Sequence, residues 1–290
     1  MALIAAVPPP DEPRLASTYA EPIVKWAGGK RGLRRELLAL IPADIGTYFE
    51  PFLGGGAVFL ALAPQRAVLS DANRELIDLY QTVAQNPSSV MEELDRLQPH
   101  VLDSDFYYAE RAASPAALEP ARRAARFIFL NKTCYNGLYR VNSAGRFNVP
   151  FGRYAKPPSL YNGVNFFRVA ALLGKAKLCN DDFAPALTSA GRGDFAYLDP
   201  PYVPLTPTAS FTRYTAGSFG EKDQRRLAET IHDLAARGCR FLLSNSDTPL
   251  VRRLYAAYHV SEVHAPRNIN SNAARRQKIS ELAIYNYDLH

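Results

Sequence analysis

The chain contains few of the residues that form disulfide bonds and metal sites. Its 290 residues include three cysteines and five histidines. Cys134, Cys179 and Cys239 are odd in number and far apart, and none belongs to a C-x-x-C pair. The sequence therefore predicts neither a disulfide framework nor a zinc site, and no metal is expected. Reduced cysteines fit a cytoplasmic protein.

Long apolar runs are also absent. The N-terminal stretch Ala2–Val7 is apolar, but it is short, lacks a basic lead and runs into Pro8-Pro9-Pro10. A secretion signal and a membrane span both need a longer apolar segment. We therefore expect no membrane association, and we interpret residues 1–20 as a flexible tail.

Acidic residues are fewer than basic ones. The chain has 28 Asp and Glu against 34 Lys and Arg, a net charge of +6. This balance favours a polyanionic partner, because the summed field attracts negative charge. It is equally compatible with a mildly basic enzyme. Apolar residues make up 47% of the chain, enough for a core domain with an insertion.

Apolar runs alternate with glycine turns and helical stretches at both ends of the chain, as in βαβ units. The middle is helical and then rich in basic and aromatic residues. We therefore predict an α/β sheet domain formed by residues 21–75 and 162–290, with a mostly helical domain inserted at 76–161. The expected strands are 48–52, 67–70, 177–179, 195–198 and 241–244, and the expected helices include 56–63, 73–80, 90–97, 121–131 and 224–236.

Asp199-Pro200-Pro201-Tyr202 directly follows the apolar run 195–198. Two prolines cannot continue a central strand, and they stiffen the turn that follows it. A carboxylate and an aromatic ring are thus fixed at the carboxyl edge of the sheet, where α/β folds bind ligands. The alternative is an ordinary proline-rich turn.

A glycine-rich turn, Phe52-Leu53-Gly54-Gly55-Gly56, lies between an expected strand and an expected helix. Glycines there let the backbone approach a ligand. Asp71 ends the next expected strand and could accept hydrogen bonds from ribose hydroxyls. The alternatives are a plain turn at the glycines and a helix-capping role for Asp71.

The single tryptophan lies in K-W-A-G-G-K, residues 25–30. The face of Trp26 attracts cations and stacks on bases, and Lys30 can neutralise a carboxylate. A buried Trp beside a turn is the alternative. The segment is not a Walker loop, because G-x-x-x-x-G-K-[ST] is absent.

K-W-A-G-G-K, E-P-F-L-G-G-G, S-D-A-N and L-D-P-P-Y occur in this order, and together they resemble the D12 class of DNA adenine-N6 methyltransferases. The resemblance runs from about Ile23 to Tyr287. It looks closest to the Dam-like branch, which methylates GATC, through the segments 131–140, 147–154 and 204–212. It implies a Rossmann-like sheet that binds S-adenosylmethionine (SAM), with an inserted target-recognition domain.

By this resemblance the cofactor is SAM. The positions that match its binding residues, or contact it in the predicted site, are Trp26, Lys30, Phe52, Gly54, Asp71, Phe183 and Asp199. Phe183 resembles the aromatic residue that packs on the SAM adenine, and simple core packing is its alternative.

Adenine N6 is a poor nucleophile, because its lone pair is delocalised into the ring. Asp199 and the carbonyl of Pro200 are expected to accept its two N–H bonds, which localises the lone pair for direct attack on the methyl group. Tyr202 would stack on the target base. A base inside a duplex must be flipped out to reach such a site.

The middle segment interleaves cations with aromatic rings, a pattern suited to phosphates, guanine edges and wedging between bases. The positions that match DNA contacts of the Dam-like branch are Tyr135, Leu138, Arg140 and Pro150, and Arg153 lies in the same basic segment. One departure is K-T-C at 132–134, where relatives often carry R-Y-G. A solvated basic loop is the alternative.

A second polar and basic loop contains Arg267, Asn270 and Arg275. We interpret it as a clamp on backbone phosphates, with an exposed loop as the alternative.

The leading hypothesis is therefore a monomeric, cytoplasmic and nucleoid-associated enzyme that methylates adenine N6 in double-stranded DNA. A cognate restriction endonuclease could act on the same DNA sequence without binding to this protein. The alternatives are methylation of cytosine N4 or RNA, and a catalytically inactive DNA-binding protein on the same core.

Overall fold

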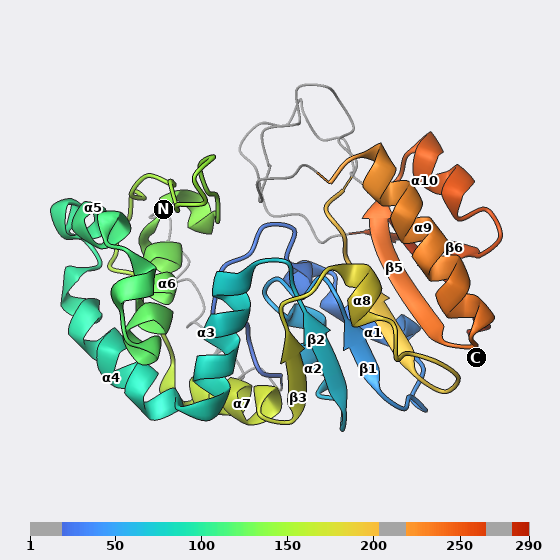
Figure 1. Ribbon diagram of the computed structural model, residues 1–290, viewed down its shortest axis with the longest axis horizontal. Helices are drawn as coiled ribbons and strands as arrows, with labels where there is room; N and C mark the ends of the chain where they lie inside the picture. Colours follow the sequence, from blue (N-terminus) through green and yellow to red (C-terminus); the bar gives the residue numbers. More distant parts are fainter. Residues whose placement is uncertain (1–18, 203–218, 265–279, 290) are drawn as a thin grey trace, which may run out of the picture.

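The computed structural model describes residues 19–202, 219–264 and 280–289. A seven-stranded sheet forms its centre, and helices cover both faces of that sheet (Figure 1). A group of helices from the middle of the chain lies beside the sheet and forms the second part of the molecule. The α/β, Rossmann-like architecture predicted from the sequence is confirmed.

The sheet has the strand order β3-β2-β1-β4-β5-β7-β6. The first five strands in this order run parallel, and β7 is antiparallel to both of its neighbours. The expected strand 48–52 ends earlier, at Glu50, because Pro51 has no N–H group to continue the ladder. The strands are β1 (Tyr48–Glu50), β2 (Ala67–Ser70), β3 (Ala176–Cys179), β4 (Phe195–Leu198), β5 (Arg240–Ser246), β6 (His259–His264) and β7 (Ser280–Tyr285).

Alternate residues of the strands enter two separate cores, one on each face of the sheet. Tyr48 and Tyr197 point into one core, whereas their neighbours Phe49 and Leu198 point into the other. This alternation buries both faces, as a parallel sheet requires. Residues of α1 (Arg34–Leu40), α2 (Ala57–Leu62), α3 (Arg74–Gln85) and α7 (Gly163–Leu173) complete the first core, and those of α8 (Phe183–Ala186), α9 (Glu221–Ala236) and α10 (Pro249–Leu254) complete the second.

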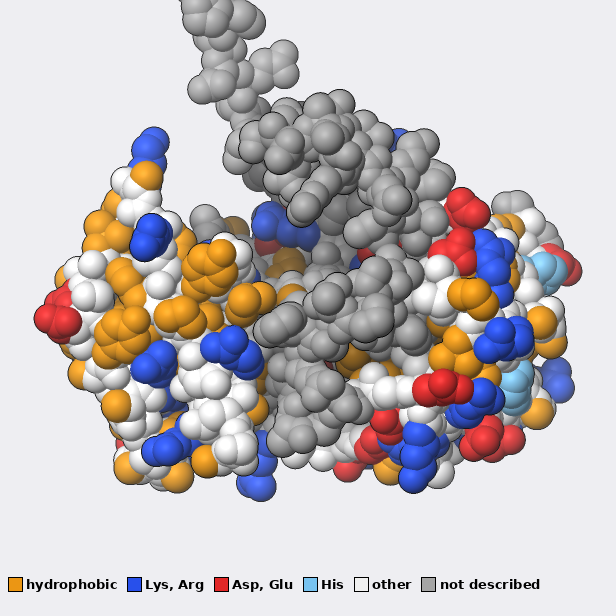
Figure 2. Space-filling model, turned by 90° about the horizontal axis from the view of Figure 1, so that it is seen from above, with side chains coloured by type: hydrophobic (Ala, Val, Ile, Leu, Met, Phe, Trp, Pro, Cys, Tyr) orange, Lys and Arg blue, Asp and Glu red, His pale blue; other side chains and the backbone are white. Residues whose placement is uncertain are grey.

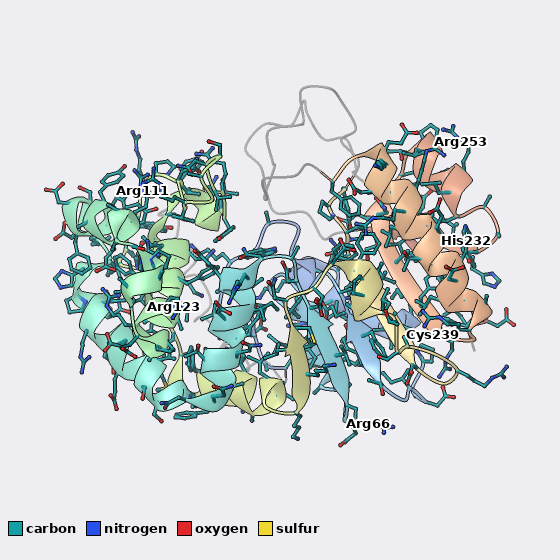
Figure 3. The ribbon with its side chains drawn as sticks, in the orientation of Figure 1. Arg66, Arg111, Arg123, His232, Cys239 and Arg253 are labelled. Atoms are coloured by element: carbon teal, nitrogen blue, oxygen red, sulfur yellow. The ribbon has the colours of Figure 1, made fainter. Side chains whose placement is uncertain are left out.

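The inserted helices pack on one another and on α3. Arg126 of α6 is only 4% exposed, and its guanidinium donates to the carbonyl oxygens of Glu110, Arg111 and Ala113. These bonds tie the end of α5 to α6, and Arg111 is marked in Figure 3. Helix α6 also packs against α3 and α4. The bounds are α4 (Pro87–Leu97), α5 (Ser104–Ala112) and α6 (Pro120–Thr133).

The insertion leaves and rejoins the sheet part through two helices that pack against each other, α3 and α7. Helix α3 begins at Arg74, so the boundary proposed at residue 76 falls inside this helix. Both junctions of the inserted segment therefore lie on the same face of the sheet.

Residues 133–152 fold back on themselves. The amide of Tyr135 donates to the carbonyl oxygen of Pro150 at 2.9 Å, and the amide of Asn148 donates to that of Arg140 at 3.0 Å. Antiparallel bridges accompany these bonds. The basic and aromatic segment is thus a hairpin with a fixed register.

The three cysteines are free thiols. Burial raises the pKa of Cys134 to about 11 and that of Cys239 to about 12. Cys239 lies directly before β5 and is marked in Figure 3. Both thiols are therefore protonated and unreactive at neutral pH.

Basic side chains are distributed over both parts of the molecule. On the face seen in Figure 2, Lys and Arg over the inserted part have few acidic neighbours, whereas acidic and basic side chains alternate over the sheet part. Within the three described ranges, no helix is long and apolar enough to cross a membrane.

Candidate active site

Three of the four sequence motifs lie at one edge of the sheet. Strand β1 pairs in parallel with β2 on one side and with β4 on the other. The loops that follow these three strands carry Gly54, Asp71 and Asp199, respectively. Because parallel strands end at the same edge, the three loops are brought together there. This is the edge that the sequence predicts for ligand binding.

The glycine turn and Asp71 are bonded directly to each other. The amide of Gly54 donates to Oδ2 of Asp71 at 2.9 Å, and the amide of Asn73 donates to Oδ1 at 2.8 Å. Burial raises the pKa of Asp71, and these two bonds oppose the shift. The capping alternative for Asp71 is wrong: Asn73 is the N-cap of α3, and its side chain accepts the amide of Leu76.

Trp26 packs closely against the glycine turn. Gly54 has a φ of +48°, and a Cβ atom there would lie 2.6 Å from Cδ1 of Trp26. Glycine is therefore required by backbone conformation and by the contact with the indole. The Trp26 ring also stacks on Tyr139, with 5.5 Å between ring centroids. Trp26 thus connects the glycine turn to the inserted hairpin.

Lys30 lies at the centre of a charged cluster and is only 4% exposed. Its Nζ lies 2.8 Å from Oδ1 of Asp199 and 3.7 Å from Oε2 of Glu281. The Tyr202 hydroxyl donates to Glu281 at 2.7 Å, and Lys30 Nζ lies 4.6 Å from the centroid of the Tyr202 ring. The K-W-A-G-G-K and D-P-P-Y segments are thus joined by one ammonium group.

Two carboxyl groups at this edge of the sheet, those of Asp199 and Glu50, have raised pKa values. Burial raises the pKa of Asp199, and the opposite charge of Lys30 counteracts this shift. Burial also raises the pKa of Glu50 to about 8, although the Tyr48 hydroxyl donates to Glu50 at 2.7 Å and lowers it. Glu50 ends β1, between the strands that carry Asp71 and Asp199.

Phe52 and Phe183 come together beside the glycine turn. Their ring centroids lie 5.4 Å apart, and Phe183 is 3% exposed. The guanidinium carbon of Arg226 lies 4.1 Å from the Phe183 ring centroid. In this structure the Phe183 ring is packed among protein side chains, so its contact with the SAM adenine stays a prediction.

The described residues expected to bind DNA lie on the hairpin of the insertion or, for Arg153, directly after it. Tyr135, Arg140, Pro150 and Arg153 are exposed and Leu138 is half-buried. Nε of Arg140 donates to the side chain of Asn148 at 2.7 Å. The other predicted clamp lies outside the described residues, and its positions are Arg267, Asn270 and Arg275.

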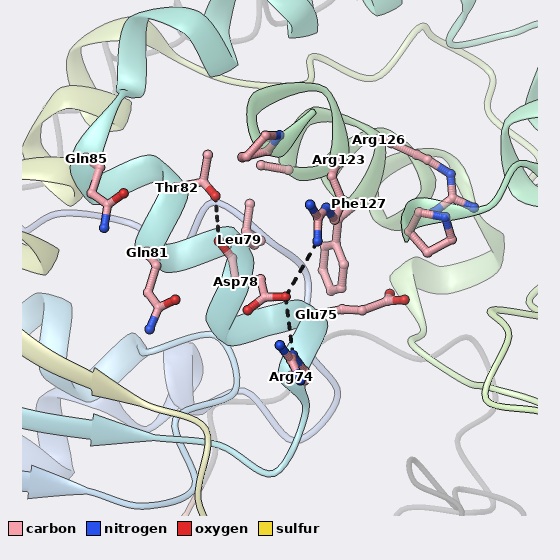
Figure 4. A pocket seen from close by; sticks show the side chains of 13 residues that line it. Arg74, Glu75, Asp78, Leu79, Gln81, Thr82, Gln85, Arg123, Arg126 and Phe127 are labelled. Atoms are coloured by element: carbon pink, nitrogen blue, oxygen red, sulfur yellow. Dashed lines mark hydrogen bonds and ion pairs between the residues drawn. The ribbon is translucent and has the colours of Figure 1, made fainter. Parts of the chain in front are cut away.

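A cavity of about 310 Å³ lies between α3 and α6 (Figure 4). Three of its charged side chains pair with one another: Asp78 lies 3.8 Å from Arg74 and 3.9 Å from Arg123. None of the described residues that are predicted to bind cofactor or target lines this cavity. It is therefore separate from the site at the sheet edge.

Glu281 and Glu50 were not found by sequence reasoning. Glu281 is separated from Tyr202 by 79 positions and reaches the site only because β7 pairs with β5. No local pattern signals that pairing. Glu50 had two signals: it begins the E-P-F-L-G-G-G motif, and an acidic residue directly after the apolar Tyr48-Phe49 is unusual in a buried strand.

Comparison with known proteins gives the family. Residues 26–269 match the family model of the D12 class N6 adenine-specific DNA methyltransferases. The chain is 38% identical over 273 residues to the type II methyltransferase M1.LlaDCHI of Lactococcus lactis subsp. cremoris, covering 92% of this chain and 95% of the relative. It is 39% identical over 287 residues to the type II methyltransferase M.MjaIII of Methanocaldococcus jannaschii, covering 92% and 99%. It is 37% identical over 264 residues to the DNA adenine methylase of Escherichia coli K12, covering 90% and 94%. The chain therefore belongs to the D12 class of N6 adenine-specific DNA methyltransferases.

Proposed function

We propose that this DNA adenine methyltransferase uses SAM as its methyl donor and acts on adenine N6 within GATC in duplex DNA. The observation that carries the proposal is the convergence of Gly54, Asp71, Lys30 and Asp199 at the carboxyl edge of neighbouring parallel strands. Residues 76–161 are assigned to target recognition. Two relatives are named type II methyltransferases, which supports a restriction endonuclease that acts on the same sequence without being bound.

The side chains at this edge fit the functional groups of SAM. Each carboxylate oxygen of Asp71 accepts one backbone amide, which leaves further lone pairs for ribose hydroxyls. The cluster of Lys30, Asp199 and Glu281 has a net negative charge when its members are ionised, which suits a sulfonium cation. When bound, SAM supplies a methyl group on a positively charged sulfur, which an amine attacks directly.

The chain's own groups then act on the target amine. Lys30 contacts Oδ1 of Asp199, so we assign Oδ2 and the carbonyl oxygen of Pro200 as acceptors for the two N–H bonds of adenine N6. The methylated nitrogen must lose one proton. Asp199 is suited to accept it, because burial raises its pKa. Tyr202 would stack on the base, with Lys30 beside its ring.

The GATC assignment rests on the hairpin 133–152. Its fixed register presents Tyr135, Arg140 and Pro150 on one exposed segment that resembles the Dam-like branch. A guanidinium can bond guanine O6 and N7 together, and an exposed aromatic ring can wedge between bases. Arg140 is thus assigned to a guanine and Tyr135 to a wedge.

The proposal is tested by incubating the enzyme with tritiated SAM and matched substrates. We expect incorporation into a GATC duplex, and N6-methyladenine as the product after nucleoside hydrolysis. Duplexes altered at one position, single-stranded DNA and RNA should accept little label. Label in N4-methylcytosine or RNA, or equal label in every duplex, would contradict the proposed substrate.

The Asp199→Ala variant should bind the duplex and lose most turnover, because phosphate contacts supply much of the affinity. Asp247→Asn is the matched control, since Asp247 follows β5 at the same sheet edge and pairs with Arg252. A near wild-type single-turnover rate in Asp199→Ala would remove Asp199 from the reaction.

A further inference from the structure

We propose that Glu281 is a positioning residue that holds the Tyr202 ring in place through the tyrosine hydroxyl. The inference rests on the proposed function, in which Tyr202 stacks on the flipped adenine. Glu281 lies in β7 and belongs to none of the four sequence motifs.

The geometry gives Glu281 two partners in the site. Its Oε2 accepts the Tyr202 hydroxyl at 2.7 Å and lies 3.7 Å from Nζ of Lys30. A hydrogen bond to an ionised acceptor is short and about twice as strong as a neutral one. The hydroxyl is therefore fixed at the end of the ring opposite the backbone, which limits how far the ring can tilt.

The backbone that carries Glu281 is rigid by comparison with the loop that carries Tyr202. Glu281 pairs with Ser246 of β5 and with Val263 of β6. Tyr202 follows two prolines after β4 and belongs to no strand. A side chain on an interior strand of the sheet thus sets the orientation of a side chain on a turn.

Glu281 also adjusts the charge at the reacting carboxylate. Asp199 faces Lys30, Glu281 and the Tyr202 hydroxyl, and Glu50 lies on the neighbouring strand. The negative charge of Glu281 raises the pKa of Asp199, whereas Lys30 lowers it. Loss of this charge should therefore move the acidic limb of the single-turnover pH profile to lower pH.

The test is a mutant cycle with single-turnover methylation of a GATC duplex as the readout. We expect Tyr202→Phe and Glu281→Ala each to slow the step about tenfold, and the double variant to be no slower than the slower single one. Glu281→Gln keeps an acceptor for the hydroxyl, so it should recover much of the rate. In the Tyr202→Phe background, Glu281→Gln should change the rate by less than about threefold.

Glu262→Gln is the matched control, because Glu262 lies on the adjacent strand β6, is largely exposed and pairs with Arg252. It should leave the rate unchanged. Rates that multiply in the double variant, or a Glu281→Gln enzyme as slow as Glu281→Ala, would overturn the inference.

A second measurement does not depend on methyl transfer. Fluorotyrosine placed at position 202 of the whole protein reports the mobility of that ring by ¹⁹F NMR. We expect a single restrained ring in the wild type and in Glu281→Gln, and an averaged, narrower signal in Glu281→Ala. An unchanged signal in Glu281→Ala would refute the positioning role. If the wild type transfers no methyl group while this pattern holds, the proposed function fails and the positioning role stands.

Discussion

The burial of Lys30 between two carboxylates predicts how the site contributes to stability. At an effective dielectric constant of about 20, the attraction of Lys30 to Asp199 at 2.8 Å is about 6 kcal/mol, and its attraction to Glu281 at 3.7 Å is about 4.5 kcal/mol. Desolvation of the charges and repulsion between the carboxylates offset most of this attraction. Either carboxylate alone can therefore keep the buried ammonium paired.

We expect Asp199→Asn and Glu281→Gln each to lower the free energy of unfolding by no more than about 1 kcal/mol. The double variant leaves Lys30 buried without a negative partner, which costs about 3–5 kcal/mol in buried pairs that lose one member. The loss in the double variant should therefore exceed the sum of the single losses by more than about 1 kcal/mol.

Urea denaturation of the three variants and the wild type at neutral pH measures these differences. Asp247→Asn serves as the control, because it neutralises a carboxylate at the same sheet edge that pairs with the exposed Arg252. Strict additivity of the two single losses would refute the reasoning, since it would mean that Lys30 does not share the two carboxylates.

Three further predictions follow from individual side chains of the site. Asp71→Ala should weaken SAM binding by about 1–3 kcal/mol in calorimetry while the protein stays folded, and unchanged affinity would remove Asp71 from the cofactor site. Arg140→Ala should relax the preference at one guanine of GATC by about 1–3 kcal/mol in kcat/KM, whereas equal loss on all sequences would make Arg140 a phosphate contact. Because burial raises the pKa of Glu50 to about 8, its contribution to stability is complete below its ordinary pKa and is lost as the pH rises toward 8. The free energy of unfolding of Glu50→Gln, measured in urea relative to the wild type, should therefore be more favourable at pH 9 than at pH 5. A constant difference between the two proteins from pH 5 to 9 would contradict the raised pKa.

The sequence predicts the sheet well where apolar runs are short and bounded. The apolar runs 67–70 and 195–198 predict strands, and they form β2 and β4 with the same bounds. The first run is followed by Asp71 and the second by Asp199-Pro200, so the polar residue after each run marks where the strand ends. Because Asp71 and Asp199 directly follow these two strands, the sequence also predicts which edge of the sheet binds the ligand.

The contacts between distant segments could not be predicted. Glu281 reaches Tyr202 through the antiparallel pairing of β7 with β5, and that register depends on the whole sheet. The sequence does not predict the hairpin at 133–152, because this segment shows no alternation of apolar and polar residues. The sequence also does not decide which residue caps α3, because the side chains of both Asp71 and Asn73 can accept a backbone amide at a helix start. In the structure Asn73 is the N-cap.

The attachment of the insertion to α3 and α7 has a consequence for how such a gene can change. The two helices pack together and flank residues 86–162, so that segment can be replaced without cutting a strand of the sheet. Under the proposed assignment of the insertion to target recognition, selection for the chemistry and selection for a new target sequence fall on separate stretches of the gene. Recombination at two points then exchanges one inserted segment for another, provided that the incoming helix preserves the packing of α6 against α3.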